Sequence, residues 1–205
     1  PHREPPHRST TKRTHRYTLH MTPIDLLIKP HSILQSALTS NGAPPDISAL
    51  SGMGIAIQER HIVAIDTPAR LSAQYQANQT LDLPNHLLMP GLINAQGHAL
   101  GIVSRGSAAP TDVFAAPLAL GPDTKTQAFS DDELFAAAQL AFTEMMLAGT
   151  TTCADLSPFS EIVAKAAESV GIHAQISVPV PDEANAWTDS AQEGLERALT
   201  LHDTY

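Results

Sequence analysis

The stretch that decides the fold is residues 88–98, which read LMPGLINAQGH. It begins within the apolar run of residues 87–94, and so continuous a run is typical of a strand buried on both faces in a parallel sheet. Polar side chains follow at the carboxyl end, where a barrel of parallel strands keeps its active site. Gln96 and His98 are two residues apart, so in extended chain they project to the same face. This spacing lets two side chains share one metal ion.

The chain downstream alternates helical and strand patterns. Ser130 precedes three acidic residues, which predicts a helix start there, and Gly149 predicts the end of that helix. We expect further elements in this order: a strand over 150–156, a helix over 159–170, a strand over 172–178 and a helix over 189–205. Residues 101–126 are rich in Gly, Pro and Ala and predict a loop. The alternation predicts βαβ units and therefore a parallel sheet.

The chain upstream of residue 88 predicts a small, mostly β unit over residues 22–88. Its expected elements are a strand over 24–28 bounded by prolines, a loop over 41–46, a hairpin of 53–57 and 60–65 joined by Gln58-Glu59, a short helix over 69–76 and a strand over 79–83.

Charge is unevenly distributed along the 205 residues, whose net charge is −9. Residues 1–20 hold five Lys or Arg and one Glu with almost no aliphatic side chains, so we expect residues 1–21 to form a disordered basic extension, non-native or translated from upstream. Three prolines oppose the amphipathic helix of a transit peptide, and a nucleic-acid-binding arm stays open as an alternative. The remaining residues are acidic, which argues against a general nucleic-acid or anionic-membrane binder.

Length, hydropathy and cysteine usage limit the protein class further. A complete (β/α)8 barrel needs about 250 residues, more than this chain supplies. No apolar run reaches the about 18 residues of a membrane span. The single cysteine, Cys153, cannot form an internal disulfide, so nothing indicates an oxidising compartment. A mixed α/β protein located in the cytoplasm is expected.

Two motifs together resemble the opening of the amidohydrolase superfamily, in particular its TRZ/ATZ-type branch, which includes 5-methylthioadenosine/S-adenosylhomocysteine deaminases. They are PGLINA followed by His98 and AGTTTCAD at residues 148–155, and the likeness extends from about residue 22 to Tyr205. The resemblance implies a fold of the α/β class. Residues 22–88 would be part of a urease-like composite β-sandwich, and residues 89–205 would be about three βα units of a (β/α)8 barrel.

The resemblance also implies a function and a cofactor. Such enzymes hydrolyse C–N bonds other than peptide bonds, and here the small-molecule substrate would be a purine nucleoside such as 5-methylthioadenosine or S-adenosylhomocysteine. One divalent metal ion per site, commonly zinc, supplies the attacking water, and carboxylates move the protons. Two histidines end the first barrel strand in the family, and they match Gln96 and His98 here. Only His98 is retained, and a glutamine amide is a poorer zinc ligand than imidazole.

The resemblance leaves the catalytic set incomplete. The family's other metal ligands and its proton-transferring glutamate lie on later strands, beyond the span of these 205 residues. The stretch that contacts substrate in the family reads VFAAPLALGPDTKT at residues 113–126 and is altered, so catalytic and substrate-binding residues stay unassigned. An alternative is a non-catalytic truncated fragment or pseudoenzyme without the full metal site. Its unclosed sheet edge would favour association, including a homo-oligomer.

Five other residues carry structural expectations. Cys153 is expected to be a small buried hydrophobe, because no base is paired with it. Asp155 is expected to accept hydrogen bonds from backbone N–H groups of the following turn or helix. His173 is expected to pack at the start of its strand and His202 to be solvated, whereas Trp187 either lines the mouth of a site or anchors a loop.

Overall fold

The computed structural model describes residues 21–37, 46–105, 129–180, 184 and 187–205. The expected basic extension, apart from Met21, and the altered stretch at 113–126 lie outside the described residues. The chain divides into two compact units, and the boundary along the sequence falls between Pro90 and Gly91. Each unit is described separately. No helix in the described part of the chain is long and apolar enough to cross a membrane.

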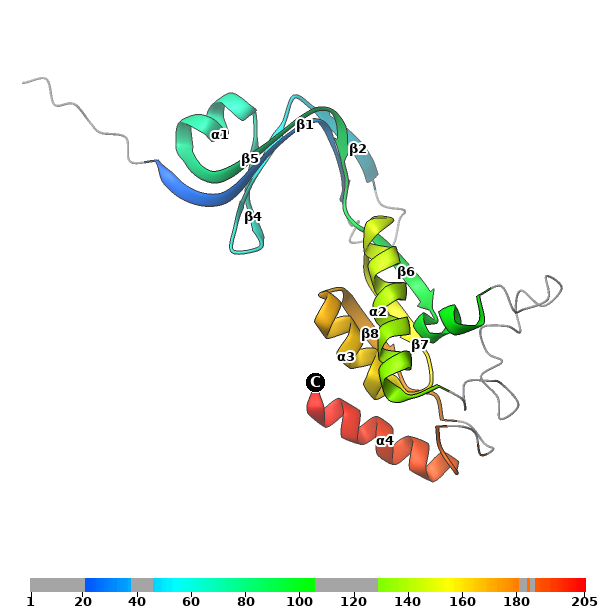
Figure 1. The fold of residues 1–205 in the computed structure, drawn as a ribbon. Coiled ribbons are helices and arrows are strands. Elements are labelled where there is room, and N and C mark those ends of the chain that lie inside the picture. The colour runs from blue at the N-terminus through cyan, green and yellow to red at the C-terminus, as the bar shows by residue number, and fades with distance from the viewer. Residues whose placement is uncertain (1–20, 38–45, 106–128, 181–183, 185–186) are drawn as a thin grey trace, which may run out of the picture. The chain divides into compact units, whose positions relative to one another are not determined.

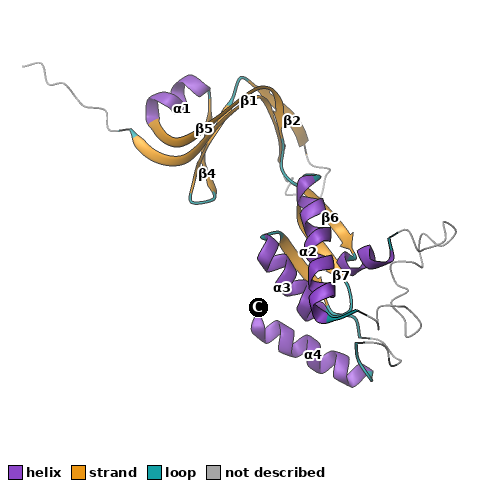
Figure 2. Cartoon of the chain, in the orientation of Figure 1, coloured by secondary structure: helices purple, strands orange, loops and turns teal. Residues whose placement is uncertain are grey.

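Among its described residues, the first unit has one five-stranded sheet and one short helix (Figures 1 and 2). Its elements are β1 (Thr22–Ala37), β2 (Asp46–Ser51), β3 (Gly54–Gln58), β4 (His61–Asp66), α1 (Pro68–Gln74) and β5 (Tyr75–Leu88). The order β2-β1-β3-β4 is antiparallel throughout, and β5 pairs with β1 in parallel. The mostly β character expected from the sequence is confirmed for the described residues.

β1 is much longer than the strand predicted over 24–28, because it runs through both prolines that bounded the prediction. Proline lacks the N–H that a sheet ladder uses, and the register with β5 shifts between Pro30 and Ser32. The first half of β1 pairs with β3 and the second half with β2, so a continuous set of partners keeps the strand extended. The strand predicted over 79–83 is likewise only the middle of β5.

The hairpin of β3 and β4 is present, but its turn lies one residue later than predicted. Glu59 and Arg60 have φ values of 49° and 69°, the left-handed geometry of a two-residue hairpin turn, without a glycine to signal it. The Glu59 N–H donates to Oδ2 of Asp25 at 2.8 Å, which ties the turn to β1. The residue that begins β2, Asp46, falls at the end of the predicted loop, whose other residues are not described.

The second unit is a three-stranded parallel sheet with helices between its strands. Its elements are β6 (Leu92–Gly97), the 3₁₀ helix η1 (Ala99–Ser104), α2 (Asp131–Leu147), β7 (Thr150–Leu156), α3 (Ser160–Val170), β8 (His173–Ser177) and α4 (Ala191–Thr204). The order is β6-β7-β8, and both pairings are parallel, which confirms the βαβ prediction. The core of this unit gathers side chains of η1, α2, β7 and α3.

The prediction of one continuous strand over residues 87–94 is wrong. Leu88 ends β5 and Leu92 begins β6, so the apolar run supplies strands to two different sheets. The break falls at Pro90 and Gly91, where proline lacks a ladder donor and a Cβ at residue 91 would collide with the side chain of Thr151. Burial on both faces is also wrong, because Ile93 is 72% exposed.

The helix ends predicted from capping residues are confirmed. The Ser130 hydroxyl accepts the Glu133 N–H, while the Glu133 carboxylate accepts the Ser130 N–H, which forms a capping box. Gly149, with φ at 90°, lies two residues beyond the end of α2. Ser190 caps α4 in the same way as Ser130 caps α2, by accepting the Glu193 N–H at 3.2 Å.

Candidate metal-ligand site at the end of β6

His98 is the first residue after β6 and the N-cap of η1, at the carboxyl edge of the parallel sheet. Its half-buried ring places Nδ1 2.7 Å from the carbonyl oxygen of Leu156, the last residue of β7. A carbonyl only accepts hydrogen bonds, so Nδ1 must carry the proton in this contact. Nε2 is then the ring nitrogen left to bind a metal ion, which is the arrangement of a metal-ligating histidine.

A second contact, made by Asp155 of β7, also holds the turn that carries His98. Asp155 is fully buried, and its Oδ2 accepts the Ala99 N–H at 2.7 Å. The prediction that Asp155 accepts a backbone N–H is confirmed, but the donor belongs to the turn after β6 and not to the turn after β7. Sequence alone places Asp155 next to its own following turn, whereas the parallel register sets it opposite Gly97.

Gly97 allows this close approach of the two strands. A Cβ at residue 97 would collide with Sγ of Cys153 and would lie 3.2 Å from Oδ2 of Asp155. No side chain larger than hydrogen therefore fits without movement of β6 or β7. The glycine in the sequence motif is explained by this contact, one residue before His98.

Gln96 is exposed, and its backbone N–H donates to Oδ1 of Asn94 at 3.2 Å. Within the described ranges, no group of three or more His, Cys, Asp or Glu side chains could hold a metal ion. A zinc site needs three or four protein ligands. The described residues thus fit one such ligand, the Nε2 of His98, and they do not form a complete site. That Gln96 and His98 share one ion stays a prediction.

His98 also lines a pocket of about 510 Å³ between η1, α2 and the start of β7. The polar side chains of this pocket include an ion pair that sequence reasoning missed. Arg105 contacts both carboxylate oxygens of Glu144, at 3.0 and 2.6 Å. This pairing lowers the pKa of the Glu144 carboxyl and raises the pKa of the Arg105 guanidinium. The pair attaches the end of η1 to α2, and both side chains line the pocket.

Cys153 is buried with no exposed surface, as predicted. Burial raises the pKa of its thiol from 9.0 to about 11, and the nearby charge of Asp155 adds to the shift. A neutral thiol is a poor nucleophile and a poor metal ligand. The residue therefore acts in packing, under the turn that carries His98.

Trp187 anchors the segment before α4, the second of its two predicted alternatives. Its buried Nε1–H donates to both carboxylate oxygens of Glu161 in α3 at 3.1 Å. Arg197 in α4 pairs with the same carboxylate at 3.0 Å and lies 5.6 Å from the Trp187 ring centroid. This cluster attaches α4 to α3. Its residues lie far from His98 along the sequence.

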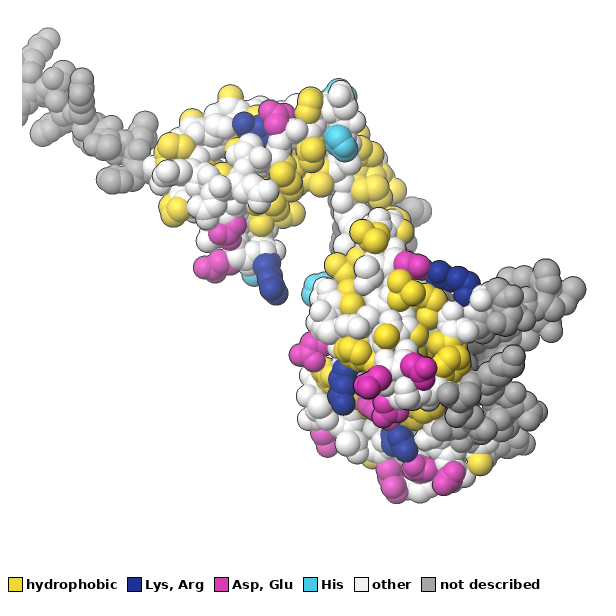
Figure 3. Space-filling view, in the orientation of Figure 1, with side chains coloured by type: hydrophobic (Ala, Val, Ile, Leu, Met, Phe, Trp, Pro, Cys, Tyr) yellow, Lys and Arg dark blue, Asp and Glu magenta, His cyan; other side chains and the backbone are white. Residues whose placement is uncertain are grey.

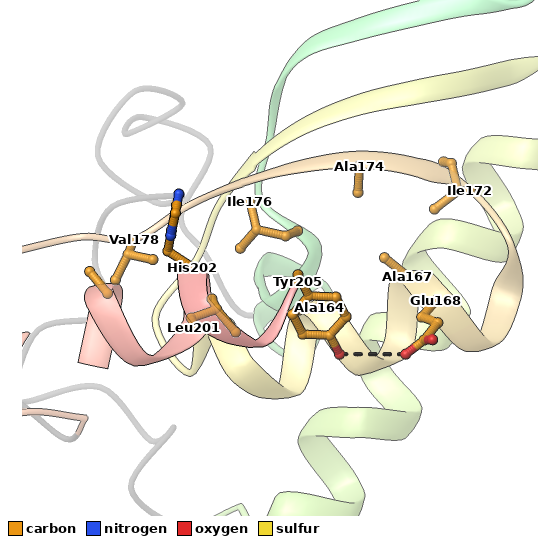
Figure 4. Close-up of a pocket in the computed structure, with 11 residues that line it drawn as sticks. Ala164, Ala167, Glu168, Ile172, Ala174, Ile176, Val178, Leu201, His202 and Tyr205 are labelled. Atoms are coloured by element: carbon orange, nitrogen blue, oxygen red, sulfur yellow. Dashed lines mark hydrogen bonds between the residues drawn. The ribbon is translucent and has the colours of Figure 1, made fainter. Parts of the chain in front are cut away.

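The two other histidines have different outcomes. His173 is exposed at the start of β8, so the packing prediction is wrong. The side chain of His202 is 87% exposed, which confirms that it is solvated. His202 borders a second pocket of about 710 Å³ between α3, β8 and α4, lined mainly by Ala, Ile, Val and Leu side chains (Figure 4). The Tyr205 hydroxyl contacts the Glu168 carboxylate there at 3.5 Å.

Comparisons with known proteins give the family and agree with this fold. The profile of the amidohydrolase family matches residues 87–204. The chain is 30% identical over 197 residues to a 5-methylthioadenosine/S-adenosylhomocysteine deaminase of Saccharophagus degradans, covering 90% of this chain and 40% of the relative. A deaminase of the same description from Teredinibacter turnerae is 36% identical over 138 residues, which is 64% of this chain and 30% of the relative.

Solved structures show the same fold. A zinc-bound adenosine deaminase from Xanthomonas campestris superposes with a TM-score of 0.75 at 24% identity, over 90% of this chain and 40% of that protein. A zinc complex of atrazine chlorohydrolase from Arthrobacter aurescens superposes with a TM-score of 0.63 at 22% identity, over 88% of this chain and 43% of that protein.

These findings place the described residues in a mixed α/β fold that the two solved neighbours share. The chain belongs to the amidohydrolase family, because the family profile covers more than half of it. It spans about 40% of the length of the Saccharophagus relative and about 30% of the Teredinibacter relative.

Proposed function

We propose that this chain belongs to a metal-dependent deaminase that hydrolyses the C–N bond of a purine nucleoside such as 5-methylthioadenosine or S-adenosylhomocysteine. The names of the relatives support this substrate class. The proposal includes the expected architecture, with residues 22–88 as part of a composite β-sandwich and residues 89–205 as the first βα units of a (β/α)8 barrel. It also places the protein in the cytoplasm.

The observation that carries the proposal is the orientation of the His98 ring. Its Nδ1–H is engaged by the Leu156 carbonyl at 2.7 Å, so Nε2 is the nitrogen left for a metal ion at the carboxyl edge of the sheet. Zinc is the proposed ion, because imidazole suits zinc and the two solved neighbours above hold it. Gln96 would contribute at most a neutral amide oxygen, which binds zinc more weakly than imidazole.

The reaction is a hydrolysis at a ring carbon. The bond from that carbon to the amino nitrogen breaks and a bond to the oxygen of water forms. One water proton leaves with the amino group as ammonia, and the other stays on the product, on the ring nitrogen beside the new carbonyl. A bound metal ion supplies a Lewis acid and an activated water in such chemistry. The contribution of this chain is the placement of His98, whose proton stays on Nδ1 through the contact with β7.

The test uses the full 205-residue chain with zinc sulfate and either nucleoside, and it measures ammonia release and bound zinc. We expect bound zinc that His98→Ala removes; zinc-dependent ammonia release by this chain, lost in the same variant, would show in addition that the chain is catalytic. His202→Ala is the matched control, because this exposed histidine lies on α4 and should leave both quantities unchanged. Gln96→His should raise zinc affinity, since it restores a second imidazole beside His98. Equal zinc content in the unsubstituted chain, in His98→Ala and in Gln96→His would contradict the ligand proposal.

A second candidate is the non-catalytic role, which two observations favour. The described residues hold no cluster of three metal-ligating side chains. Apolar side chains are also exposed on the surface of the second unit (Figure 3), among them Ile93 on β6 and Leu147 on α2. Association without zinc binding or ammonia release, measured by size-exclusion chromatography and the assay above, would favour this candidate over the deaminase.

A further inference from the structure

Two consecutive residues of β7 hold two consecutive residues after β6. The Leu156 carbonyl accepts the His98 Nδ1–H at 2.7 Å, and Oδ2 of Asp155 accepts the Ala99 N–H at the same distance. These contacts join segments that are 56 to 58 residues apart in sequence. The position of the His98 ring is therefore set by the end of β7 as much as by β6.

A fully buried aspartate such as Asp155 is unusual as a hydrogen-bond acceptor with a purely structural role. Its side chain has no exposed surface, and Oδ1 has no hydrogen-bond partner among the described residues. A buried carboxylate costs free energy unless it is paired, whereas a neutral side chain could accept one N–H at lower cost. A residue that lowers the stability of the fold at the edge of a site is expected to have a role in that site.

We propose that Asp155 is a positioning residue for His98. By holding the Ala99 N–H, its carboxylate fixes the turn so that the His98 Nδ1–H meets the Leu156 carbonyl and Nε2 is the ring nitrogen that this contact does not engage. Gly97 takes part because only glycine lets β6 lie against Asp155 and Cys153 at this point. The metal-binding consequence rests on the proposed function, whereas the effect on the ring does not.

Nuclear magnetic resonance of the histidine-labelled full chain tests the proposal, because ring carbon and nitrogen shifts distinguish the two neutral tautomers. His98→Ala identifies the His98 signals among the ten histidines. In the unsubstituted chain His98 should be the Nδ1–H tautomer. Asp155→Ala should convert it to the mixture of an unconstrained imidazole, and Asp155→Asn, which keeps an acceptor oxygen, should restore the Nδ1–H form.

Two further variants separate positioning from general damage. Ala99→Pro removes the donated N–H while keeping the carboxylate, at a first helical position where proline is tolerated, and should alter the tautomer as Asp155→Ala does. Ser157→Ala is the matched control, because this buried side chain lies two residues further on and its hydroxyl has no partner in the described part of the chain. It should leave the His98 signals unchanged.

Zinc titration gives the second readout. Asp155→Ala should weaken zinc binding about 10- to 100-fold relative to the unsubstituted chain, as loss of a ligand-orienting partner does elsewhere. An Nδ1–H tautomer that persists in both Asp155→Ala and Ala99→Pro would overturn the positioning role. Absence of zinc binding by the unsubstituted chain would instead contradict the proposed function, and the tautomer result would still decide the role of Asp155.

Discussion

The two units bury their apolar side chains in different ways. In the first unit the described core cluster has four buried residues, Ile24, Leu27, Ala56 and Leu71. In the second unit a larger cluster joins η1, α2, β7 and α3, with Phe142 and Leu134 among its fully buried side chains. A single seven-residue helix covers the first sheet, whereas long helices separate the strands of the second.

This difference shows what holds each unit together. Strand pairing dominates the first unit, where β1 is hydrogen-bonded to three other strands and Ile62 and Val63 of β4 stay exposed. Helix packing dominates the second, where α2 and α3 bring apolar side chains to the parallel sheet. Only the second arrangement fixes a loop at the carboxyl edge of a sheet, and His98 lies on that loop.

The largest effect should come from Phe142→Ala in α2. This ring is completely buried, and its removal leaves a cavity, so we expect a loss of about 3–5 kcal/mol in the free energy of unfolding. Urea unfolding followed by fluorescence of Trp187, the single tryptophan, reports on the second unit. Leu147→Ala on the same helix is the control, since this side chain is 85% exposed and should change stability by less than about 0.5 kcal/mol. Equal effects would contradict the packing described for α2.

A smaller loss is expected from Leu71→Ala in α1. Its side chain is buried in the cluster of the first unit, and we expect a cost of about 2 kcal/mol, because the few surrounding residues can collapse around the gap. Circular dichroism should detect the change, while the Trp187 transition should stay in place. A shift of the Trp187 midpoint equal to that of the dichroism signal would show that the two units unfold together. Leu81→Ala in β5 is the exposed control.

Gly97→Ala tests the close approach of β6 and β7. The added Cβ would press on Cys153 and Asp155, so overpacking should cost about 1–3 kcal/mol. Gly101→Ala is the control, because its Cβ would come no closer than 3.8 Å to the His98 side chain. A double variant with Cys153→Ala should recover part of the lost stability, since it removes the sulfur atom that lies nearest to the added Cβ. No recovery in the double variant would contradict this contact.

The last effect should come from the Cys153 thiol and appears only as a pH dependence. Burial and the charge of Asp155 raise its pKa from 9.0 to about 11. Between these values the thiol ionises in the unfolded chain but stays protonated in the folded chain, so stability falls as pH rises. Cys153→Ala should lose less stability than the unsubstituted chain over this range, measured by urea midpoints. A pH slope unchanged by the substitution would contradict the assigned pKa.

Local signals in the sequence predicted the second unit well. Ser130 and Gly149 marked the ends of α2, because capping and left-handed glycine are properties of single residues. The same reasoning failed at the run of residues 87–94, where hydrophobicity suggested one buried strand. Pro90 and Gly91 divide that run between two sheets, and which sheet each half joins depends on partners far along the chain.

The candidate site was predicted in part. The motif around Gly97 indicated His98 as a ligand position, and the amide at Gln96 was visible as a departure from the family. The ring-orienting acceptor was missed, because it is the backbone carbonyl of Leu156 and a carbonyl leaves no mark in a sequence. The donor to Asp155 was missed for a related reason, since parallel register joins residues on strands separated by a helix.

The sequence by itself determined the family, the order of strands and α-helices after residue 91, the acidic character of the chain and the histidine at the end of β6. These are properties of residue type and spacing along the chain. The 3₁₀ helix η1 was not among them, because the prediction of a loop over residues 101–126 is wrong for residues 101–104. Only the tertiary structure decided that β7 holds the His98 turn, that Arg105 pairs with Glu144 and that Trp187 anchors α4. Each of these contacts joins residues at least 26 positions apart, and their geometry is set by strand register and helix packing.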